Sequence, residues 1–132
     1  MKENNPTVQC RVRVTRGTDI AVGPGKIDLL AAIRDTGSIS AAARKMHMSY
    51  RRAWLLVETM NSCFQQPLVE TVTGGRSGGG AQLTAEGEKV LQGYTAMMVE
   101  IDRLAERYLG VLLRNSPLSA ATAELERTSE SE

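Results

Sequence analysis

The chain has 132 residues, 42% of them apolar, which suits one compact domain with one appended element and excludes two full domains. The sequence lacks both the run of roughly eighteen apolar residues that a membrane helix needs and the apolar stretch of a secretory signal, so we expect a cytoplasmic protein with no membrane segment. Sixteen Lys and Arg side chains nearly balance fifteen Asp and Glu side chains, which excludes a strongly basic or acidic protein overall.

The charges are nevertheless divided unevenly along the chain. Residues 1–84 hold eleven basic and six acidic side chains, a net charge of +5, whereas residues 85–132 hold five basic and nine acidic ones, a net charge of −4. Chance clustering is one explanation. The other, which we favour, is a basic working module joined to a part with a different role.

Near the N-terminus, apolar side chains alternate with polar ones at Val8, Cys10, Val12 and Val14. This period of two predicts a leading β-strand over residues 8–14 with one buried face. A Gly-Pro-Gly sequence at 23–25 ends the segment, and apolar residues at helical spacing then predict a helix over residues 26–35. Gly37 is placed to end that helix.

Two short helices joined by a tight turn are predicted over residues 38–61. Ser38 can cap an alanine-rich helix over residues 39–46, and Ser49 can cap a further helix over residues 50–61, because a serine hydroxyl accepts a hydrogen bond from a free amide of the first turn. The buried stripe of this last helix is predicted to contain Ala53, Trp54, Val57 and Met60. Its outer face is then left with Tyr50, Arg51, Arg52 and Leu55.

A β-hairpin is predicted over residues 68–83, after Pro67 and around a glycine-rich tip. Together these elements predict a mainly α fold with a small β component, a winged helix-turn-helix over residues 1–84. Thr84 is placed to cap a long helix over residues 85–113. The polar tail over residues 114–132 has no periodicity and is predicted to be disordered.

Apolar residues of the long helix recur at alternating steps of four and three, as in a coiled coil. This row predicts a dimerisation surface formed by Val90, Tyr94, Met97, Ile101, Leu104 and Tyr108, with Val111 as its next member. The alternative is that the row only packs on the core of its own domain. Dimerisation is favoured because a helix that rises about 1.5 Å per residue would project beyond so small a core.

The pattern of chemically reactive residues does not favour an enzyme, a metal or a cofactor. The single histidine, His47, falls in the turn between two helices, where a turn residue or a phosphate neighbour is favoured over a catalyst. Cys10 and Cys63 have no ligand or disulfide partner at suitable spacing, and we expect both to be buried apolar side chains. The glycines at 74–80 lack the Gly-Lys-Ser/Thr ending of a phosphate loop, which leaves a hairpin tip without function or one that contacts DNA.

The exposed first half of the helix at 50–61 is the predicted DNA-reading surface, because that part of a helix-turn-helix enters the major groove. Arginine can pair with guanine through two hydrogen bonds, and serine and tyrosine can donate to base edges or phosphates. The hairpin tip can reach a minor groove or an adjacent phosphate. An exposed basic cluster can also be a merely solvated face, but its coincidence with this helical order favours DNA binding. The predicted DNA contacts are Ser38, Ser40, Arg44, Lys45, Ser49, Tyr50, Arg51, Arg52, Arg76 and Ser77.

Four stretches resemble the N-terminal winged helix-turn-helix domain of the ModE family of molybdenum-dependent transcriptional regulators, which is itself related to LysR-type DNA-binding domains. They are residues 26–33, 37–40, 49–54 and 73–84, and the similarity extends over about residues 8–112. The resemblance implies a homodimer held by the strand region and the long last helix, with one recognition helix for each half of an inverted repeat. In that family separate C-terminal domains sense molybdate. The polar tail here leads us to expect that they are absent.

We therefore expect a sequence-specific transcriptional regulator that binds double-stranded DNA as a homodimer, with molybdenum-related genes as the regulon that the resemblance implies. The alternative is a protein-interaction module, or co-regulator, that pairs through its last helix with a second regulatory protein and does not itself sense molybdate. A third possibility is direct binding of an oxyanion at the glycine-rich tip.

Overall fold

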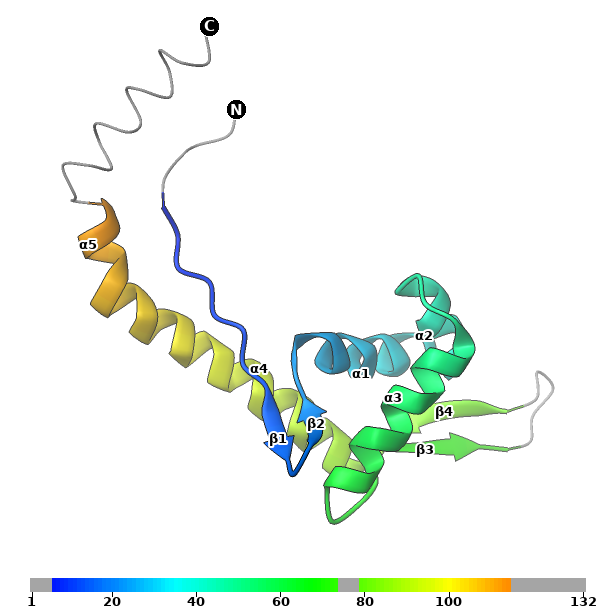
Figure 1. Ribbon diagram of the computed structural model, residues 1–132. Helices are drawn as coiled ribbons and strands as arrows, with labels where there is room; N and C mark the ends of the chain where they lie inside the picture. Colours follow the sequence, from blue (N-terminus) through cyan, green and yellow to red (C-terminus); the bar gives the residue numbers. More distant parts are fainter. Residues whose placement is uncertain (1–5, 74–78, 115–132) are drawn as a thin grey trace, which may run out of the picture. The chain divides into compact units, whose positions relative to one another are not determined.

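The computed structural model describes residues 6–73 and 79–114 (Figure 1). Residues 11–96 form one compact unit, and the other unit contains residues 6–10 and 97–114 among those described. The described chain is mainly helical with two small two-stranded sheets, which confirms the predicted fold class. None of the described helices is both long enough and apolar enough to cross a membrane.

The larger unit begins with an antiparallel hairpin of β1 (Val14–Arg16) and β2 (Asp19–Val22). A two-residue turn joins the strands, and Gly17 adopts the left-handed φ of 63° that such turns require. Ala21 and Val22 bury their side chains at the end of β2.

The predicted strand over residues 8–14 is wrong in extent, because strand pairing begins only at Val14. The alternation is present up to Val12: the side chains of Val8, Cys10 and Val12 are half-buried and the polar residues between them are exposed, but Val14 is exposed as well. An alternating pattern indicates which side chains face the protein, but it does not reveal whether a second strand lies beside them.

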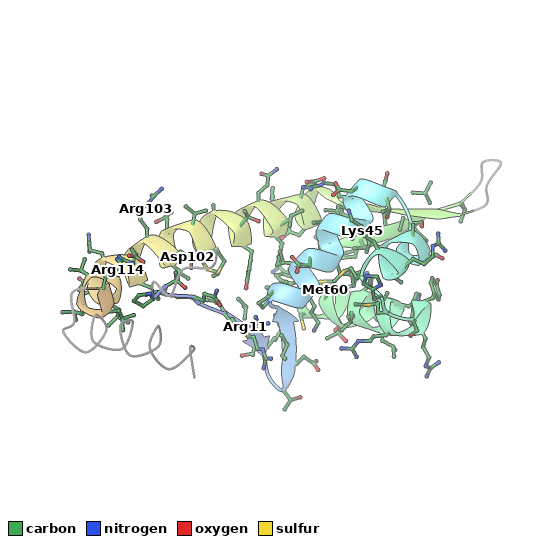
Figure 2. All side chains as sticks on the ribbon, turned by 90° about the horizontal axis from the view of Figure 1, so that it is seen from above. Arg11, Lys45, Met60, Asp102, Arg103 and Arg114 are labelled. Carbon is green, nitrogen blue, oxygen red and sulfur yellow. The ribbon has the colours of Figure 1, made fainter. Side chains whose placement is uncertain are left out.

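Three helices form the core of the larger unit: α1 (Pro24–Thr36), α2 (Ile39–Lys45) and α3 (Tyr50–Cys63). Pro24 begins α1, where its fixed φ suits a first helical turn, and Gly37 ends it with a φ of 79°. Ala42 and Ala43 of α2 and Ala53 of α3 are buried and permit close approach of these helices. The largest fully buried side chains are Leu29, Leu30, Ile33, Leu68 and Met60, the last of which is labelled in Figure 2.

The predicted hairpin after α3 is present as β3 (Val69–Val72) and β4 (Gly80–Leu83), which lie side by side in Figure 1. The two strands are antiparallel, with Val69 opposite Leu83 and Val72 opposite Gly80. We call this hairpin the wing. The predicted DNA contacts Arg76 and Ser77 lie outside the described residues.

The long last helix is present but is not uniform. It consists of α4 (Ala85–Ala105), a π-helical turn (Glu106–Gly110) and α5 (Val111–Arg114). Within the π-helical turn and α5, Arg114 forms an ion pair with Glu106. Arg114, predicted to begin the tail, is helical, and residues 115–132 lie outside the described part of the chain.

Candidate nucleic-acid interface

The turn between α2 and α3 is fixed by main-chain hydrogen bonds. The amide of Met48 donates to the carbonyl of Ala43 at 3.0 Å, and that of His47 donates to Arg44 at 3.1 Å. His47 has a φ of 58°, a left-handed conformation that is uncommon for a residue with a side chain. Its exposed imidazole and its backbone angles make His47 a turn residue, as the sequence predicts.

Serine hydroxyls cap both helices of the motif, as predicted. The hydroxyl of Ser38 accepts a hydrogen bond from the amide of Ala41 at 2.9 Å, and that of Ser49 accepts one from the amide of Arg52 at 3.1 Å. Each cap satisfies an amide that a helix N-terminus would otherwise leave free. Because a hydroxyl that accepts a hydrogen bond keeps its own proton, each serine can still donate to an anion.

The outer face of α3 combines cationic and large apolar side chains. Tyr50 is 54% exposed, Trp54 41% and Leu55 47%, and both Arg51 and Arg52 are exposed beside them. Guanidinium groups suit guanine edges, and apolar side chains suit the methyl group of thymine. This face therefore has the chemistry needed to read a major groove.

The prediction that Trp54 lies on the buried stripe of α3 is wrong. The buried residues are Ala53, Val57, Met60 and Cys63. Successive residues are separated by about 100° around a helix, so the residue after Ala53 turns toward the edge of the stripe. Within the described part of the chain the indole is 41% exposed, so that edge of the stripe is left uncovered. Trp54 is therefore a candidate contact that the sequence pattern did not reveal.

The predicted contacts on α2 lie on its exposed side. Arg44 donates to the hydroxyl of Ser40 over 3.5 Å, one helical turn earlier. Lys45, labelled in Figure 2, lies 4.0 Å from a carboxylate oxygen of Asp35 at the end of α1. These side chains are exposed, as contacts to a DNA backbone would need to be.

Asn61, near the end of α3, holds the base of the wing. Its side-chain oxygen accepts hydrogen bonds from the amides of Leu68 and Val69, at 2.8 and 3.2 Å. Its side-chain nitrogen donates to the carbonyl of Val69 at 3.1 Å. One amide side chain thus fixes the start of β3 relative to the recognition helix α3. Sequence reasoning missed this role, since nothing local distinguishes Asn61 from a surface asparagine.

The other strand of the wing is attached to the turn between α1 and α2. The amide of Ala81 donates to the carbonyl of Gly37 at 2.9 Å. A Cβ atom on Gly80 would lie 2.8 Å from the same carbonyl oxygen, closer than a carbon atom can approach without displacing the backbone. Gly80 therefore permits the contact that sets the position of β4.

The long helix begins directly at the base of the wing. Thr84 donates from its amide to the carbonyl of Leu68 at 2.9 Å, and its hydroxyl accepts from the amide of Gly87 at 3.0 Å. The hydroxyl also donates to the carbonyl of Pro67 at 2.7 Å. A Cβ atom on Gly87 would collide with the carbonyl of Leu68. This joint sets the direction in which α4 leaves the wing.

Tyr94 was predicted to belong to the dimerisation surface, but its side chain is buried within the larger unit. Its side chain is only 8% exposed, and its hydroxyl donates to the carbonyl of Val12 at 2.6 Å. The ring packs in the core of the larger unit because this part of α4 still covers that unit. Of the other residues in the predicted row, Val90, Met97 and Ile101 are half-buried, whereas Leu104 and Tyr108 are exposed.

The π-helical turn changes which residues can continue that row. A π-helical turn accommodates one extra residue, so positions after it are offset by one relative to a regular α-helix. With this offset of one residue, the row that contains Ile101 and Leu104 continues at Leu109 in place of Tyr108. Its next member is then Leu112 in place of Val111. All of these later side chains are exposed.

Lys26 has a structural role within the larger unit. Its amino group donates to the carbonyl of Ile20, which ties α1 to β2. Burial lowers the pKa of Lys26, while nearby Cys63 and Asp19 oppose that shift. The thiol of Cys63 is buried, as predicted, whereas Cys10 is only half-buried. Among the described residues no group of His, Cys, Asp or Glu could hold a metal ion.

A tight turn between two short helices, a capped recognition helix with an exposed basic face and a wing after it define a winged helix-turn-helix DNA-binding domain. Residues 25–88 match the family described as "Bacterial regulatory helix-turn-helix protein, lysR family". The chain therefore contains a LysR-type helix-turn-helix domain, the module of a family of transcriptional regulators and not of enzymes. This confirms the resemblance found in the sequence.

Curated relatives include the Azotobacter vinelandii "Molybdenum transport protein ModE", which is 43% identical over an alignment of 101 residues that covers 72% of this chain and 37% of that protein. The Rhodobacter capsulatus "Molybdenum-pterin-binding protein MopB" is 42% identical over 72% of this chain and 35% of its own length. The Escherichia coli K12 "DNA-binding transcriptional dual regulator ModE" is 44% identical over 54% of this chain and 27% of its own length. The chain thus spans about a third of the length of the curated relatives it matches.

Among solved structures, a complex of the CbnR DNA-binding domain with DNA matches with a TM-score of 0.50 and 21% identity. The match covers 64% of this chain and 91% of that one. At this identity the likeness shows the fold alone, and that fold is the winged helix-turn-helix already described.

Proposed function

We propose that the chain is a sequence-specific transcriptional regulator that binds an inverted-repeat operator as a homodimer. The observation that carries this proposal is the outer face at the start of α3, where Arg51 and Arg52 stand exposed behind the Ser49 cap. A major groove about 12 Å wide admits one helix presented in this way.

In this proposal the start of α3 reads bases, and the surrounding elements grip the backbone. Arg51 and Arg52 pair with guanine edges, Ser49 and Tyr50 donate to bases or phosphates, and Trp54 contacts a thymine methyl group. Backbone contacts come from Ser38, Ser40, Arg44 and Lys45, with Arg76 and Ser77 at the wing tip.

We propose that the second copy pairs along the last helix. Exposed large apolar side chains gather there, at Leu104, Tyr108, Leu109, Val111, Leu112 and Leu113. Leu104, Leu109 and Leu112 belong to one row of this helix, and exposed apolar side chains that share a face mark an interaction site. In a symmetric dimer each recognition helix meets one half-site, which is why the proposed operator is an inverted repeat.

The regulated genes are proposed from the relatives. Proteins named for molybdenum transport, molybdenum-pterin binding and dual transcriptional regulation share 42 to 44% identity with this chain over the matched residues. This similarity over the matched residues supports operators near molybdenum-related genes for this chain too.

Selection of bound fragments from a random DNA pool tests the proposal directly. We expect an inverted repeat whose half-sites lie about one helical turn, 10 to 10.5 base pairs, apart or a multiple of it. Affinity for the selected duplex should fall with salt at a log–log slope of about −0.9 per phosphate contacted. DNA recognition would be refuted if the selected fragments shared no sequence and the affinity did not change with salt concentration.

Substitution of the recognition arginines tests the assignment of α3. Arg51→Ala or Arg52→Ala should cost about 1–3 kcal/mol of specific binding and relax the preference at one base position. Arg103→Ala, which removes an exposed charge from α4, serves as the control and should leave the base preference unchanged. An equal effect of all three variants would contradict base reading by α3.

Sizing in solution tests the dimer. A stable homodimer that Leu109→Glu or Leu112→Glu converts to monomer is the expected result. A monomer that pairs only with a second regulatory protein would instead support the co-regulator alternative. Calorimetry with molybdate and tungstate addresses oxyanion binding, and the proposed regulator should give no heat with either.

A further inference from the structure

A polar groove of about 880 Å³ lies between the α1–α2 turn and the wing. The Gly37–Ala81 hydrogen bond joins its two sides at the base. Polar side chains on the helical side are Arg34, Thr36, Ser38, Ser40 and Arg44, and those on the other side are Gln82 and Glu88. Arg34 was not among the contacts predicted from the sequence.

The groove is rich in groups that bind anions. Arg34 and Arg44 each carry five guanidinium N–H donors, and Ser38 and Ser40 each add a hydroxyl. Arg34 pairs with Asp35 through Nε at 3.0 Å, but these side chains are 47% and 49% exposed, so the pair contributes little and leaves the remaining donors for another partner.

The position of the groove identifies its partner, provided that α3 binds a major groove as proposed. A winged domain that places α3 in a major groove brings its wing over the adjacent minor groove. One sugar-phosphate strand separates those two DNA grooves. That strand must therefore pass between the wing on one side and helices α2 and α3 on the other. The polar groove occupies that position.

We infer that this groove receives the sugar-phosphate strand between the two DNA grooves, with Arg34 as a phosphate contact opposite Arg44. The lining favours a polymer over a small free anion, because Arg34, Ser40, Arg44 and Gln82 are exposed and water would compete for an isolated anion there. A phosphodiester held in place by α3 avoids that competition.

Glu88 gives the groove an opposing charge. It lies in the first turn of α4 and lines the same space as the arginines. A carboxylate there repels a phosphate, so Glu88 lowers affinity for every DNA sequence equally. Arg34 and Glu88 together thus set the affinity for the DNA sugar-phosphate backbone, and they do not affect which bases are read.

Salt-dependent binding to the selected duplex and to a random-sequence duplex tests the inference. Arg34→Ala should reduce the log–log salt slope by about 0.9 and weaken both duplexes about eightfold at 0.1 M salt. Glu88→Gln should tighten both about twofold, the size of one charge interaction across about 10 Å of water. Arg103→Ala, which removes the same charge at a residue that does not line the groove, should change the slope less than Arg34→Ala does.

A duplex with neutral methylphosphonates between the major-groove half-site and the adjacent minor groove provides the second arm. On that duplex Arg34→Ala should have no further effect. An undiminished effect there, a loss equal to that of Arg103→Ala, or a change in base preference would overturn the inference while leaving the proposed DNA binding intact. Failure of the unmodified protein to bind either duplex would refute the proposed function itself and the inference with it. Thermal melting confirms that the exposed substitutions leave the fold unchanged.

Discussion

Replacing Asn61 with alanine should detach the wing from the recognition helix at a measurable cost. Asn61 makes three hydrogen bonds to the main chain of Leu68 and Val69, between 2.8 and 3.2 Å long. At about 1 kcal/mol for each, Asn61→Ala should lower the free energy of unfolding by about 3 kcal/mol. For a domain of this size the melting temperature should fall by about 12 °C.

Urea unfolding followed by circular dichroism measures this loss, with an unchanged slope showing that the native fold is otherwise kept. Ser62→Ala is the matched control, because the exposed hydroxyl of the neighbouring residue makes one bond, to Thr59, at 2.8 Å. Asn61→Asp keeps the acceptor oxygen that the amides of Leu68 and Val69 share but loses the donor to the Val69 carbonyl, so its loss should be intermediate. If Asn61→Ala and Ser62→Ala cost the same, Asn61 does not hold the wing.

The remaining predictions concern other joints of the larger unit. Gly87→Ala should destabilise the fold by about 1–3 kcal/mol through overpacking, whereas Gly93→Ala, with open space around its added Cβ, should be neutral or stabilising by up to about 1 kcal/mol in urea unfolding. Tyr94→Phe should cost about 1 kcal/mol in the same assay, and no loss would mean that the hydroxyl is not bonded in solution. Gly80→Ala should weaken DNA binding beyond its effect on stability, by displacing β4 from Gly37, and unchanged affinity would contradict that coupling.

Local signals were sufficient to predict the helix-turn-helix itself. Serine caps at Ser38 and Ser49, a glycine end at Gly37 and a period of about 3.6 residues all act within one or two turns of the chain. The wing strands were predictable for the same reason, since a proline and a glycine-rich stretch bound them. Each of these features depends on neighbours in sequence.

Features that depend on distant residues could not be predicted in this way. Tyr94 belongs to a regular apolar row, yet its hydroxyl bonds to Val12, 82 positions earlier in the chain. Asn61 and Arg34 acquire their places only when the wing folds back beside the helices. The exposure of Trp54 likewise depends on where neighbouring elements stop covering α3, which the period of a helix does not specify.

The contact between Gly37 and Gly80 has a consequence for engineering. Gly37 ends α1 through its amide, while its carbonyl receives the hydrogen bond of the wing and faces a residue without a side chain. A wing transplanted from a related domain would therefore seat correctly only if it carried glycine at the position of Gly80. The wing of this fold is exchangeable as a cassette that includes this contact, and not as a set of tip residues alone.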